Sequence, residues 1–303
     1  MRCRRCGEKA VLKMPRHNTA VCGGCLDRYI QNQIKIAVKD HRMFSPSDRI
    51  LVAVSGGKDS LVLWDVLMRM GYRTAGLHIQ QGIGDYSSVS FQKTREFAAS
   101  RGAELIVHSL EENEGAGVLE LADLTKRSPC SACGVMKRYH FNRIAHEYGF
   151  DTVATGHNLD DEAARLMGNL LHWQEAYLSK QSPALPKTHE KLVKKVKPLY
   201  RLTEREISAY AVTRGIDYLI EECPMSAGSK QLVYKDALNR LETDAPGTKQ
   251  YFYLGFLDRQ RPELLAGEDA RLRDCERCGQ PTSLPVCSYC RLVERINLAH
   301  ETL

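Results

Sequence analysis

A short apolar run, Ile50–Val54, leads into the glycine-rich stretch Ser55–Ser60, and the amphipathic segment Leu61–Leu67 follows at once. This order of residues predicts a buried strand, a tight turn and a helix. Two glycines let the backbone of the turn approach a bound group closely, and the first turn of a helix has free N–H groups for phosphate oxygens. Lys58 adds a positive charge. The unit predicts an α/β domain with a phosphate-binding loop, and a generic glycine-rich turn is the alternative interpretation.

Strands and helices are predicted to alternate along most of the chain. Strands are predicted at residues 50–54, 74–79, 104–110, 151–155 and 217–222. Helices are predicted at about residues 88–100, 131–148, 159–173, 203–214 and 231–241. This alternation predicts a doubly wound, parallel five-stranded sheet, which is a Rossmann-like α/β fold. Ligands of such sheets bind beyond the carboxyl ends of the strands, so the candidate site segments are Ser55–Ser60, His78–Gly84, Gly156–Asp161 and Cys223.

The glycine-rich loop is not a Walker motif, which requires Gly-x-x-x-x-Gly-Lys-Ser/Thr. Ser55–Ser60 resembles the SGGKDS signature of the PP-loop ATPase superfamily, and Ala154–Glu162 resembles its GHN-x-DD element. The resemblance implies an adenine nucleotide alpha hydrolase-like fold whose loop holds pyrophosphate while an oxygen is adenylated. Asp161 could position Mg²⁺ or the reacting group, since magnesium prefers carboxylate and phosphate oxygens. Asp160 or Glu162 could instead cap the helix that follows.

Eight of the eleven cysteines form two sets with CxxC spacing, one near each end of the chain. The sets are Cys3, Cys6, Cys22 and Cys25, and Cys275, Cys278, Cys287 and Cys290. Four thiolates at this spacing are typical of a zinc ribbon, in which tetrahedral Zn²⁺ folds a module too small for its own core. Disulfides are the alternative, which a reducing compartment disfavours. Two structural zinc ions are therefore expected.

Three cysteines remain, namely Cys130, Cys133 and Cys223. The first two begin a predicted helix and the third ends the fifth predicted strand, so we expect all three at one rim of the sheet. Three thiolates are one short of a closed site, and they suit a [4Fe-4S] cluster with one iron free to take an exogenous sulfur ligand. A redox CxxC that carries a persulfide is the alternative.

With these motifs in this order, nearly all of residues 1–300 resembles the TtuA family of tRNA 2-thiouridine synthetases, which are related to cytosolic wobble-uridine thiolases. The resemblance implies an ATP-dependent tRNA sulfurtransferase that adenylates the C2 oxygen of a uridine, most simply in the T-loop, and replaces it with sulfur. It also implies that Cys130, Cys133 and Cys223 bind the [4Fe-4S] cluster. A ubiquitin-like carrier protein with a C-terminal thiocarboxylate would deliver the sulfur.

The resemblance further implies which residues form the site for ATP and Mg²⁺. The residues expected to line it are Ala53, Ser55, Gly56, Gly57, Lys58, Asp59, Ser60, His78, Ile79 and Gly156. Lys137 lies four residues after Cys133, so it should share a helix face with that thiol and point toward the space between cluster and ATP. The catalytic candidates are Lys137, Asp161 and Asp59. An exposed helix lysine is the alternative for Lys137, and a packed structural histidine is the alternative for His157.

The net charge of the chain agrees with a tRNA partner but does not require one. The net charge is +6 over 303 residues, and basic residues gather in segment 180–205, which is either a tRNA-binding surface or a solvated face. Lys194, Lys195 and Lys197 are the expected phosphate contacts there, and the two ribbons are expected to contact tRNA phosphates as well. No stretch reaches the roughly 18 apolar residues of a membrane span, and the first ten residues lack the apolar core of a signal peptide, so a cytoplasmic protein without membrane contact is expected.

Three parts are expected along the chain: an N-terminal zinc ribbon (1–30), a PP-loop domain with the iron-sulfur site (31–245), and a C-terminal helical segment with the second ribbon (246–303). Segment 174–197 is expected to be a mobile loop, and a homodimer is left open. Other functions that fit are a wobble-uridine thiolase, a tRNA 2-thiocytidine synthetase, a lysidine-type ligase, or a non-catalytic zinc-ribbon RNA-binding module. The two terminal ribbons count against the cytidine and lysidine enzymes.

Overall fold

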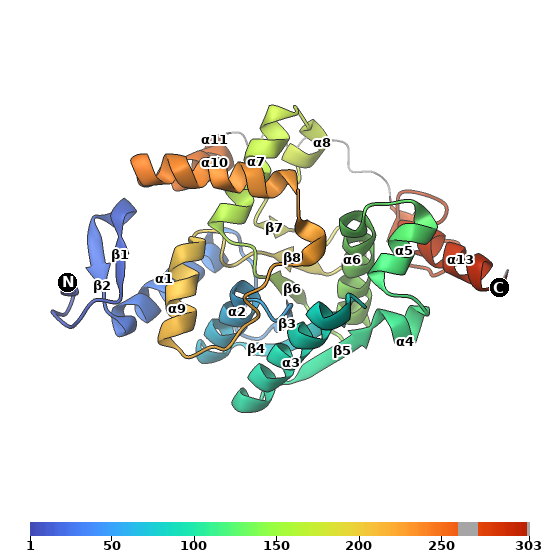
Figure 1. Cartoon of the computed structure of the whole chain (residues 1–303), viewed down its shortest axis with the longest axis horizontal. Coiled ribbons are helices and arrows are strands. Elements are labelled where there is room, and N and C mark those ends of the chain that lie inside the picture. Colours follow the sequence, from blue (N-terminus) through green and yellow to red (C-terminus); the bar gives the residue numbers. More distant parts are fainter. Residues whose placement is uncertain (260–271, 302–303) are drawn as a thin grey trace.

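The computed structural model describes residues 1–259 and 272–301, and its core is a six-stranded sheet in the order β5-β4-β3-β6-β8-β7. The strands are β3 (Arg49–Ala53), β4 (Arg73–Gln80), β5 (Leu105–Ser109), β6 (Thr152–Thr155), β7 (Ala184–Leu185) and β8 (Lys194–Val196). All neighbours are parallel except β7 and β8. The chain runs outward from β3 in both directions, so the predicted doubly wound α/β fold is confirmed (Figure 1).

The fifth parallel strand lies elsewhere than the sequence predicts. Residues 217–222 form no strand, and their one pairing is a parallel bridge between Leu219 and Gly57. The fifth parallel strand is instead β8, inside segment 174–197, where a mobile loop was expected. Because β8 is only Lys-Lys-Val and Val196 is its one apolar residue, it lacks the apolar run that predicts a buried strand.

Helices cover both faces of the sheet. They are α1 (Gly23–Asp40), α2 (Lys58–Arg69), α3 (Gly84–Arg101), α4 (Leu110–Glu114), α5 (Val118–Thr125), α6 (Pro129–Glu147), α7 (Leu159–Leu171), α8 (Glu175–Leu178), α9 (Glu204–Thr213), α10 (Lys230–Asp244), α11 (Thr248–Arg259) and α13 (Ser288–Glu301). Side chains of a strand alternate between faces. Ile50 and Val52 of β3 therefore join one core with α1, α2, α7 and α9, whereas Leu51 joins a second core with α5, α6 and α13.

The two cysteine-rich termini lie at opposite ends of the long axis (Figure 1). Each contains a small antiparallel hairpin, formed by β1 (Leu12–Met14) with β2 (Thr19–Val21) and by β9 (Arg273–Asp274) with β10 (Pro281–Thr282). Cys25 already belongs to α1, which continues to Asp40. One helix thus runs across the expected boundary between residues 30 and 31.

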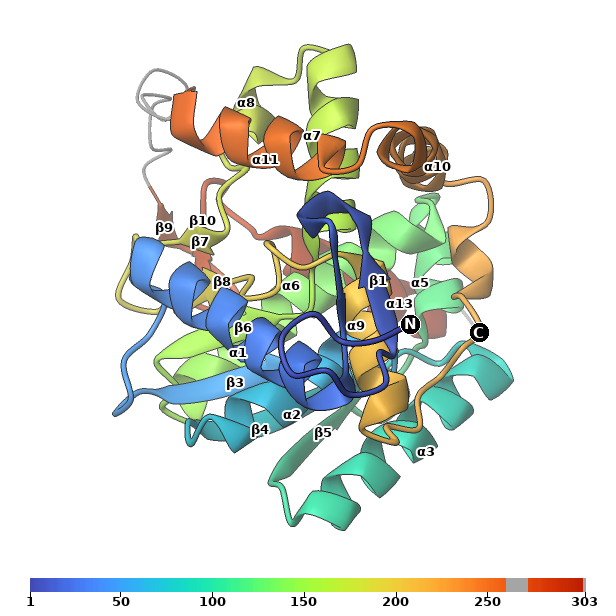
Figure 2. The same ribbon diagram turned by 90° about the vertical axis from the view of Figure 1, so that its left-hand side faces the viewer.

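An upper layer of α10 and α11 packs on α7 (Figure 2). Buried side chains of this layer, Leu238 and Tyr253, belong to the same core as β3 and α2. The helical segment expected at the start of part 246–303 includes α11, and residues 260–271 lie outside the described residues. Among the described helices, none has both the length and the apolar character to cross a lipid bilayer.

Candidate active site and metal centres

The loop between β3 and α2 is held in one shape by serine and backbone contacts. Gly56 has a φ of 72°, and a Cβ at this position would come within 2.5 Å of the Ser90 carbonyl oxygen, so glycine is required. The Ser60 hydroxyl accepts a hydrogen bond from Ser55 N at 3.1 Å and donates one to Gly57 O at 3.0 Å. The Ser90 hydroxyl donates to Ser55 O at 2.8 Å. The loop is therefore rigid before any ligand binds.

This loop ends in an open helix N-terminus. Gly57 is the N-cap residue of α2, and no side chain caps the first turn. The first N–H groups of a helix lack partners within the helix, and the helix dipole favours negative charge beside them. Ser55–Ser60 therefore offers several N–H donors and the Lys58 ammonium group at the carboxyl end of β3, where a phosphate chain can be bound.

Neighbouring strands bring the other residues expected at the nucleotide site to the loop. Ala53 ends β3, His78 and Ile79 lie near the end of β4, and Gly156 follows β6. A Cβ on Gly156 would come within 2.8 Å of Ser60 N, so the end of β6 touches the first turn of α2. The residues expected from the sequence are thus gathered between β6 and β4, on both sides of the loop.

The two histidines near the loop, His78 and His157, have uncharged rings. His78 is buried, and its Nδ1 lies 3.1 Å from Val54 O. Burial lowers the pKa of His78 to about 4, opposed by the Val54 hydrogen bond and reinforced by the positive charge of Lys137. Burial also lowers the pKa of His157 to about 4. Both rings are therefore uncharged at neutral pH.

Carboxylates and lysines gather beside the loop. Lys58 Nζ lies 2.5 Å from Glu204 and 3.2 Å from Asp59, and Lys235 Nζ lies 2.9 Å from both Asp161 and Glu204. Burial raises the pKa of Asp59, Lys58 lowers it, and the carboxylates of Asp161 and Glu204 raise it again. Neither Glu204 nor Lys235 was expected at the site from the sequence. Only the position of Glu204 in the first turn of a predicted helix could have indicated it.

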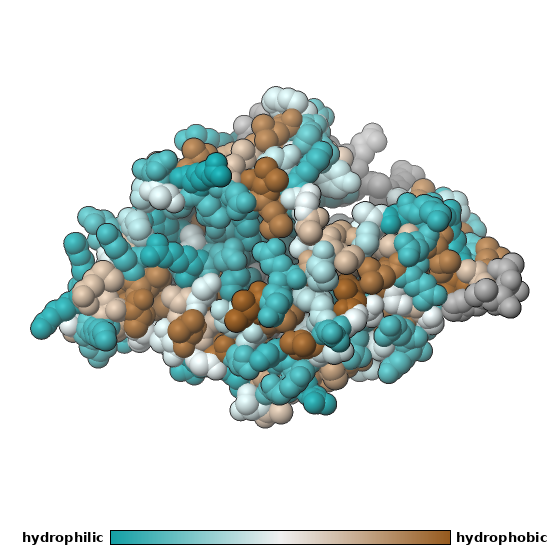
Figure 3. Space-filling view, in the orientation of Figure 1, coloured by the Kyte–Doolittle hydropathy of each residue, from teal (hydrophilic) through white to brown (hydrophobic). Residues whose placement is uncertain are grey.

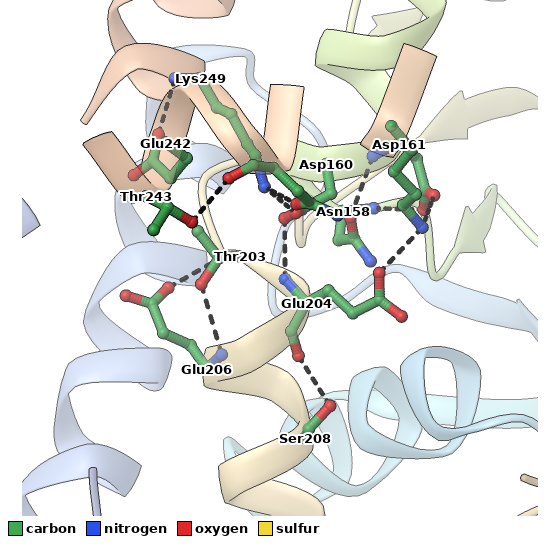
Figure 4. Close-up of polar contacts among 12 residues, drawn as sticks. Asn158, Asp160, Asp161, Thr203, Glu204, Glu206, Ser208, Glu242, Thr243 and Lys249 are labelled. Carbon is green, nitrogen blue, oxygen red and sulfur yellow. Dashed lines mark hydrogen bonds and ion pairs between the residues drawn. The ribbon is translucent and has the colours of Figure 1, made fainter. Parts of the chain in front are cut away.

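Asp161 also fixes the start of α7. Its N–H donates to Asn158 Oδ1 at 3.1 Å, and its carboxylate accepts from Asn158 N at 3.2 Å, which forms a capping box. Asn158 Nδ2 then donates to Asp59 at 3.1 Å. The close-up in Figure 4 shows Asn158 and Asp161 above Glu204. This chain of contacts couples the GHN-x-DD element to the phosphate loop.

Neither Asp160 nor Glu162 caps α7, because Asn158 is the cap residue. Asp160 instead accepts hydrogen bonds from Lys249 Nζ at 2.5 Å and from Glu204 N at 2.9 Å, which tie α7 to α11 and α9 (Figure 4). Glu162 is fully buried and forms an ion pair on the other side of the helix. Both acids therefore hold the layers together.

A cavity of about 510 Å³ lies beside this network, between the amino-terminal hairpin, α9, α10 and α11. Its lining includes Arg16, Asp160, Glu204 and Lys249, and Ser55–Ser60 are not part of it. The two are linked through Glu204, which lines the cavity and forms an ion pair with Lys58 of the loop.

Three thiols gather at the start of α6. Cys130 is exposed and Cys133 is half-buried in the first turns of the helix, and Cys223 precedes the 3₁₀ turn Pro224–Ser226. Burial raises the pKa of Cys133, Lys137 lowers it, and the neighbouring thiols of Cys223 and Cys130 raise it. The thiols thus lie close enough to interact. Their three sulfur atoms do not all lie within 4.8 Å of one another, unlike those of the two four-cysteine sets.

Lys137 acts electrostatically on both a thiol of α6 and a histidine next to the phosphate loop. It is on α6, one turn after Cys133, and is partly exposed. Its positive charge lowers the pKa of the Cys133 thiol and of the His78 imidazole behind the loop. A cation that influences both groups can stabilise negative charge on a phosphate or on a thiolate.

The terminal cysteine sets have the geometry of closed zinc sites. In each set the four sulfur atoms lie within 4.8 Å of one another. Representative separations are 3.4 Å between Cys6 and Cys22 and 3.8 Å between Cys275 and Cys290. Tetrahedral zinc with Zn–S bonds of about 2.3 Å separates its sulfur ligands by about 3.8 Å. Both sets can therefore hold a zinc ion.

Lysines in the middle of the basic segment take part in contacts within the fold. Lys197 Nζ lies 2.7 Å from the buried carboxylate of Glu162, and Lys194 Nζ donates to Arg42 O at 3.0 Å. Burial lowers the pKa of Lys195. Lys197 is thus a structural residue, which corrects the expectation that it contacts tRNA. On the face shown in Figure 3, hydrophobic and hydrophilic residues are interspersed, with hydrophobic side chains in its middle.

Comparison with protein families gives two matches. Residues 26–227 match the PP-loop domain family, and residues 2–27 match the N-terminal LIM domain of the 2-thiouridine synthetase TtuA. The first match contains the phosphate loop, the α6 cysteines and Cys223. The second contains the first four-cysteine set.

The chain is similar to characterised relatives over nearly its whole length. It is 52% identical to a tRNA-5-methyluridine(54) 2-sulfurtransferase of Thermus thermophilus, covering 98% of this chain and 92% of the relative. It is 43% identical to the protein of the same name from Thermotoga maritima, covering 98% and 97%. Among solved structures, it resembles the U34-tRNA thiolase NcsA of Methanococcus maripaludis with its [4Fe-4S] cluster, at a TM-score of 0.82, 26% identity, and 98% and 96% coverage.

Proposed function

The chain belongs to the family of TtuA-type tRNA-5-methyluridine 2-sulfurtransferases and is thus a tRNA 2-sulfurtransferase with a PP-loop fold, and on this premise we propose that it thiolates C2 of a T-loop uridine. The observation that carries the proposal is that the positive charge of Lys137 acts both on His78, next to the phosphate loop, and on the Cys133 thiol at the start of α6. This shared influence supports a phosphate site close to a sulfur site.

The proposed reaction has two steps. The uridine O2 attacks the α-phosphorus of ATP, the bond between the α and β phosphates breaks, pyrophosphate leaves, and N3 loses its proton. A hydrosulfide equivalent then attacks C2, AMP leaves with the former O2, and the sulfur-bound proton returns to N3. Ser55–Ser60 would hold the pyrophosphate, because its N–H donors and Lys58 match the charge of that leaving group.

Asp59 and Asp161 are the proposed ligands of the magnesium ion of ATP. Both carboxylates lie beside the loop, and the negative charge of Asp161 raises the pKa of Asp59. A divalent cation between them would relieve this repulsion and bridge to phosphate oxygens. Lys58 and Lys235 balance the same charges in the free protein.

Cys130, Cys133 and Cys223 are the proposed ligands of a [4Fe-4S] cluster. A cluster with three protein thiolates has one iron with a free coordination position, and so supplies a place where a sulfur donor can bind. Lys137 is proposed to be catalytic, since its ammonium group can stabilise negative charge that develops on the phosphate during either step. The sulfur source in this proposal is a ubiquitin-like carrier with a C-terminal thiocarboxylate, and the reaction takes place in the cytoplasm.

Thiolation of the wobble uridine is the second candidate, because the likeness to the U34-tRNA thiolase covers nearly the whole chain. Nucleoside mapping of tRNA from a strain lacking this gene distinguishes the two. The proposal expects loss of the 2-thio group from the T-loop nucleoside alone. Loss at the wobble position alone would replace the first candidate with the second, and unchanged thiolation of all tRNA would reject both.

The role of Lys137 needs a separate experiment with purified protein, tRNA, ATP and sulfide. Lys137→Met is expected to lower the rate of thiolation at least about 100-fold, the usual scale for losing one electrostatic stabiliser. Arg138→Met is the matched control, because Arg138 is the exposed next residue of the same helix. Equal rates for the two variants would remove Lys137 from the proposed mechanism.

A further inference from the structure

A third cluster of metal-binding side chains lies further along α6, against the carboxyl-terminal ribbon. His108 is on β5, Glu114 is the last residue of α4, and His140 is on α6. Their exposed fractions are 7%, 8% and 0%. Charged and polar side chains are rarely buried this completely unless they have partners or bind a metal.

The three side chains converge on one point. His108 Nε2 and His140 Nε2 lie 3.3 and 3.2 Å from the same oxygen, Glu114 Oε1, and the three ligand atoms lie within 4.8 Å of one another. A tetrahedral zinc ion bound at about 2.0–2.1 Å separates its nitrogen and oxygen ligands by about 3.3 Å. The observed separations therefore match ligands arranged around a single ion.

Hydrogen bonds among the described residues leave this cluster incomplete. Glu114 Oε2 and both ring nitrogens of His140 are buried and accept or donate no hydrogen bond. A buried polar atom without a partner costs about 1–3 kcal/mol. A cation at the convergence point would bind the lone pairs of His140 Nε2 and of the Glu114 carboxylate, while His140 Nδ1 would carry the proton of the neutral ring.

Metal binding requires the carboxylate anion and imidazole rings with a free lone pair, so binding would release any proton held at the ligand atoms.

We propose that His108, Glu114 and His140 bind one Zn²⁺ ion, a third zinc site besides the two four-cysteine sets. Two imidazoles and one carboxylate are a ligand set that zinc accepts, with a fourth position for water or a hydroxyl. A metal-free hydrogen-bonded cluster is the alternative, and it leaves His140 Nε2 and Glu114 Oε2 without partners.

This ion would join α6 to the carboxyl-terminal ribbon. Tyr289 of α13 donates a hydrogen bond to Glu114 Oε1 at 3.2 Å, and its ring stacks on Tyr139 of α6 with centroids 3.5 Å apart. The metal would therefore fix the far half of the helix whose first turns carry Cys130 and Cys133. Its role is in positioning, because no described contact links it to the phosphate loop.

The test uses the full chain, purified without oxygen, dialysed against Zn²⁺ and desalted. Elemental analysis is expected to give one zinc more than the two four-cysteine sets hold. X-ray absorption at the zinc edge should show nitrogen or oxygen scatterers at about 2.0–2.1 Å beside sulfur at about 2.3 Å. A zinc spectrum with sulfur ligands alone would overturn the proposal without the need for any variant.

Variants assign the extra ion to this cluster. Glu114→Gln and His140→Asn are each expected to lose one zinc per chain and the nitrogen or oxygen scatterers, while the sulfur-bound zinc remains. His146→Asn is the matched control, since His146 is exposed on the same helix. Full zinc content in both folded cluster variants would place the extra ion elsewhere and refute the assignment.

Discussion

The space around the Cα atom of Gly156 is too small for a side chain. Gly156 follows β6, and a Cβ there would come within 2.8 Å of Ser60 N and 2.9 Å of the Asp59 carbonyl carbon, both of them backbone atoms of α2. Because backbone cannot turn aside as a flexible side chain can, Gly156→Ala must move the phosphate loop. The contact that makes this glycine necessary joins two segments about a hundred residues apart, and no local pattern in the sequence shows it.

Gly156→Ala is therefore expected to weaken ATP binding at least about tenfold, equivalent to about 1.4 kcal/mol. Isothermal titration with ATP and Mg²⁺ measures the effect. Gly255→Ala is the control, because a Cβ on Gly255 meets open space and alanine favours the helix. Equal ATP affinity in the two variants would show that the loop tolerates displacement.

His78 makes the stability of the protein depend on pH. Its pKa falls from 6.5 to about 4 on folding because the ring is buried. The unfolded chain therefore takes up a proton between pH 6.5 and about 4 that the folded chain does not. The neutral ring favours the folded state fully above pH 6.5, and this contribution is lost as pH falls toward 4.

His78→Asn removes the titrating group and keeps an N–H donor for Val54 O. Between pH 7 and pH 5 the free energy of unfolding of the wild type is expected to fall by about 2 kcal/mol more than that of the variant. Denaturant unfolding at both values of pH measures the difference, in which any loss of zinc at the lower pH cancels. His146→Asn, at an exposed site, should follow the wild type, and parallel curves for all three proteins would contradict the pKa of His78.

The sequence predicted best the helices and strands whose apolar residues are the ones that pack into the core. β3, with its buried Ile50 and Val52, and α7 both occur where the pattern placed them. β8 was missed because its register comes from pairing with β6, which a Lys-Lys-Val segment does not reveal. The opposite error at residues 217–222 has the same origin. Its apolar residues pass over the phosphate loop, where Leu219 N donates to Gly56 O at 2.9 Å, without joining the sheet.

That error matters for the proposed cluster, because Cys223 is not on a strand. It is held by contacts with the 3₁₀ turn that follows, where the Ser226 hydroxyl donates to Cys223 O at 2.6 Å and the Cys130 thiol donates to Met225 O at 3.2 Å. The thiols therefore come from two elements, the start of α6 and a turn. The sequence pattern identified the three cysteines but did not predict the 3₁₀ turn that follows Cys223.

Cys223→Ser is expected to remove most of the iron and the visible absorbance of anaerobically purified protein, while the zinc content stays unchanged. The variant leaves only the two thiolates of α6 to hold the cluster. The two terminal four-cysteine sets do not contain Cys223, so their zinc ligands are unchanged. Ser131→Ala, between the two α6 cysteines, is the control. Full iron content after Cys223→Ser would exclude this residue as a ligand.

At the scale of the whole molecule, the position of the tRNA surface has to be reconsidered. Lys197 pairs with buried Glu162, so the middle of the basic segment belongs to the core. The amino-terminal module instead has exposed Arg4 and Arg5 next to one another and carries few acidic residues. Its strand β1 lines the cavity that also contains Glu204, the partner of Lys58 in the phosphate loop. RNA bound on this module would lie next to the reaction site.

Each contact between the protein and a phosphate releases condensed counterions. The slope of the logarithm of the binding constant against the logarithm of salt concentration therefore becomes less steep by about 0.9 for each contact removed. The double variant with Arg4→Ala and Arg5→Ala is expected to reduce the slope of tRNA binding by about 2, to weaken binding to all tRNAs alike, and to leave ATP affinity intact. The matched control is the double variant with Arg73→Ala and Arg95→Ala, which removes the same charge from exposed positions at the start of β4 and on α3. Filter binding across a range of salt concentrations measures both slopes. An equal loss of slope in the two double variants would show that only net charge matters. An unchanged slope in the first double variant would indicate that tRNA binds at the carboxyl-terminal ribbon, at the opposite end of the molecule (Figure 1).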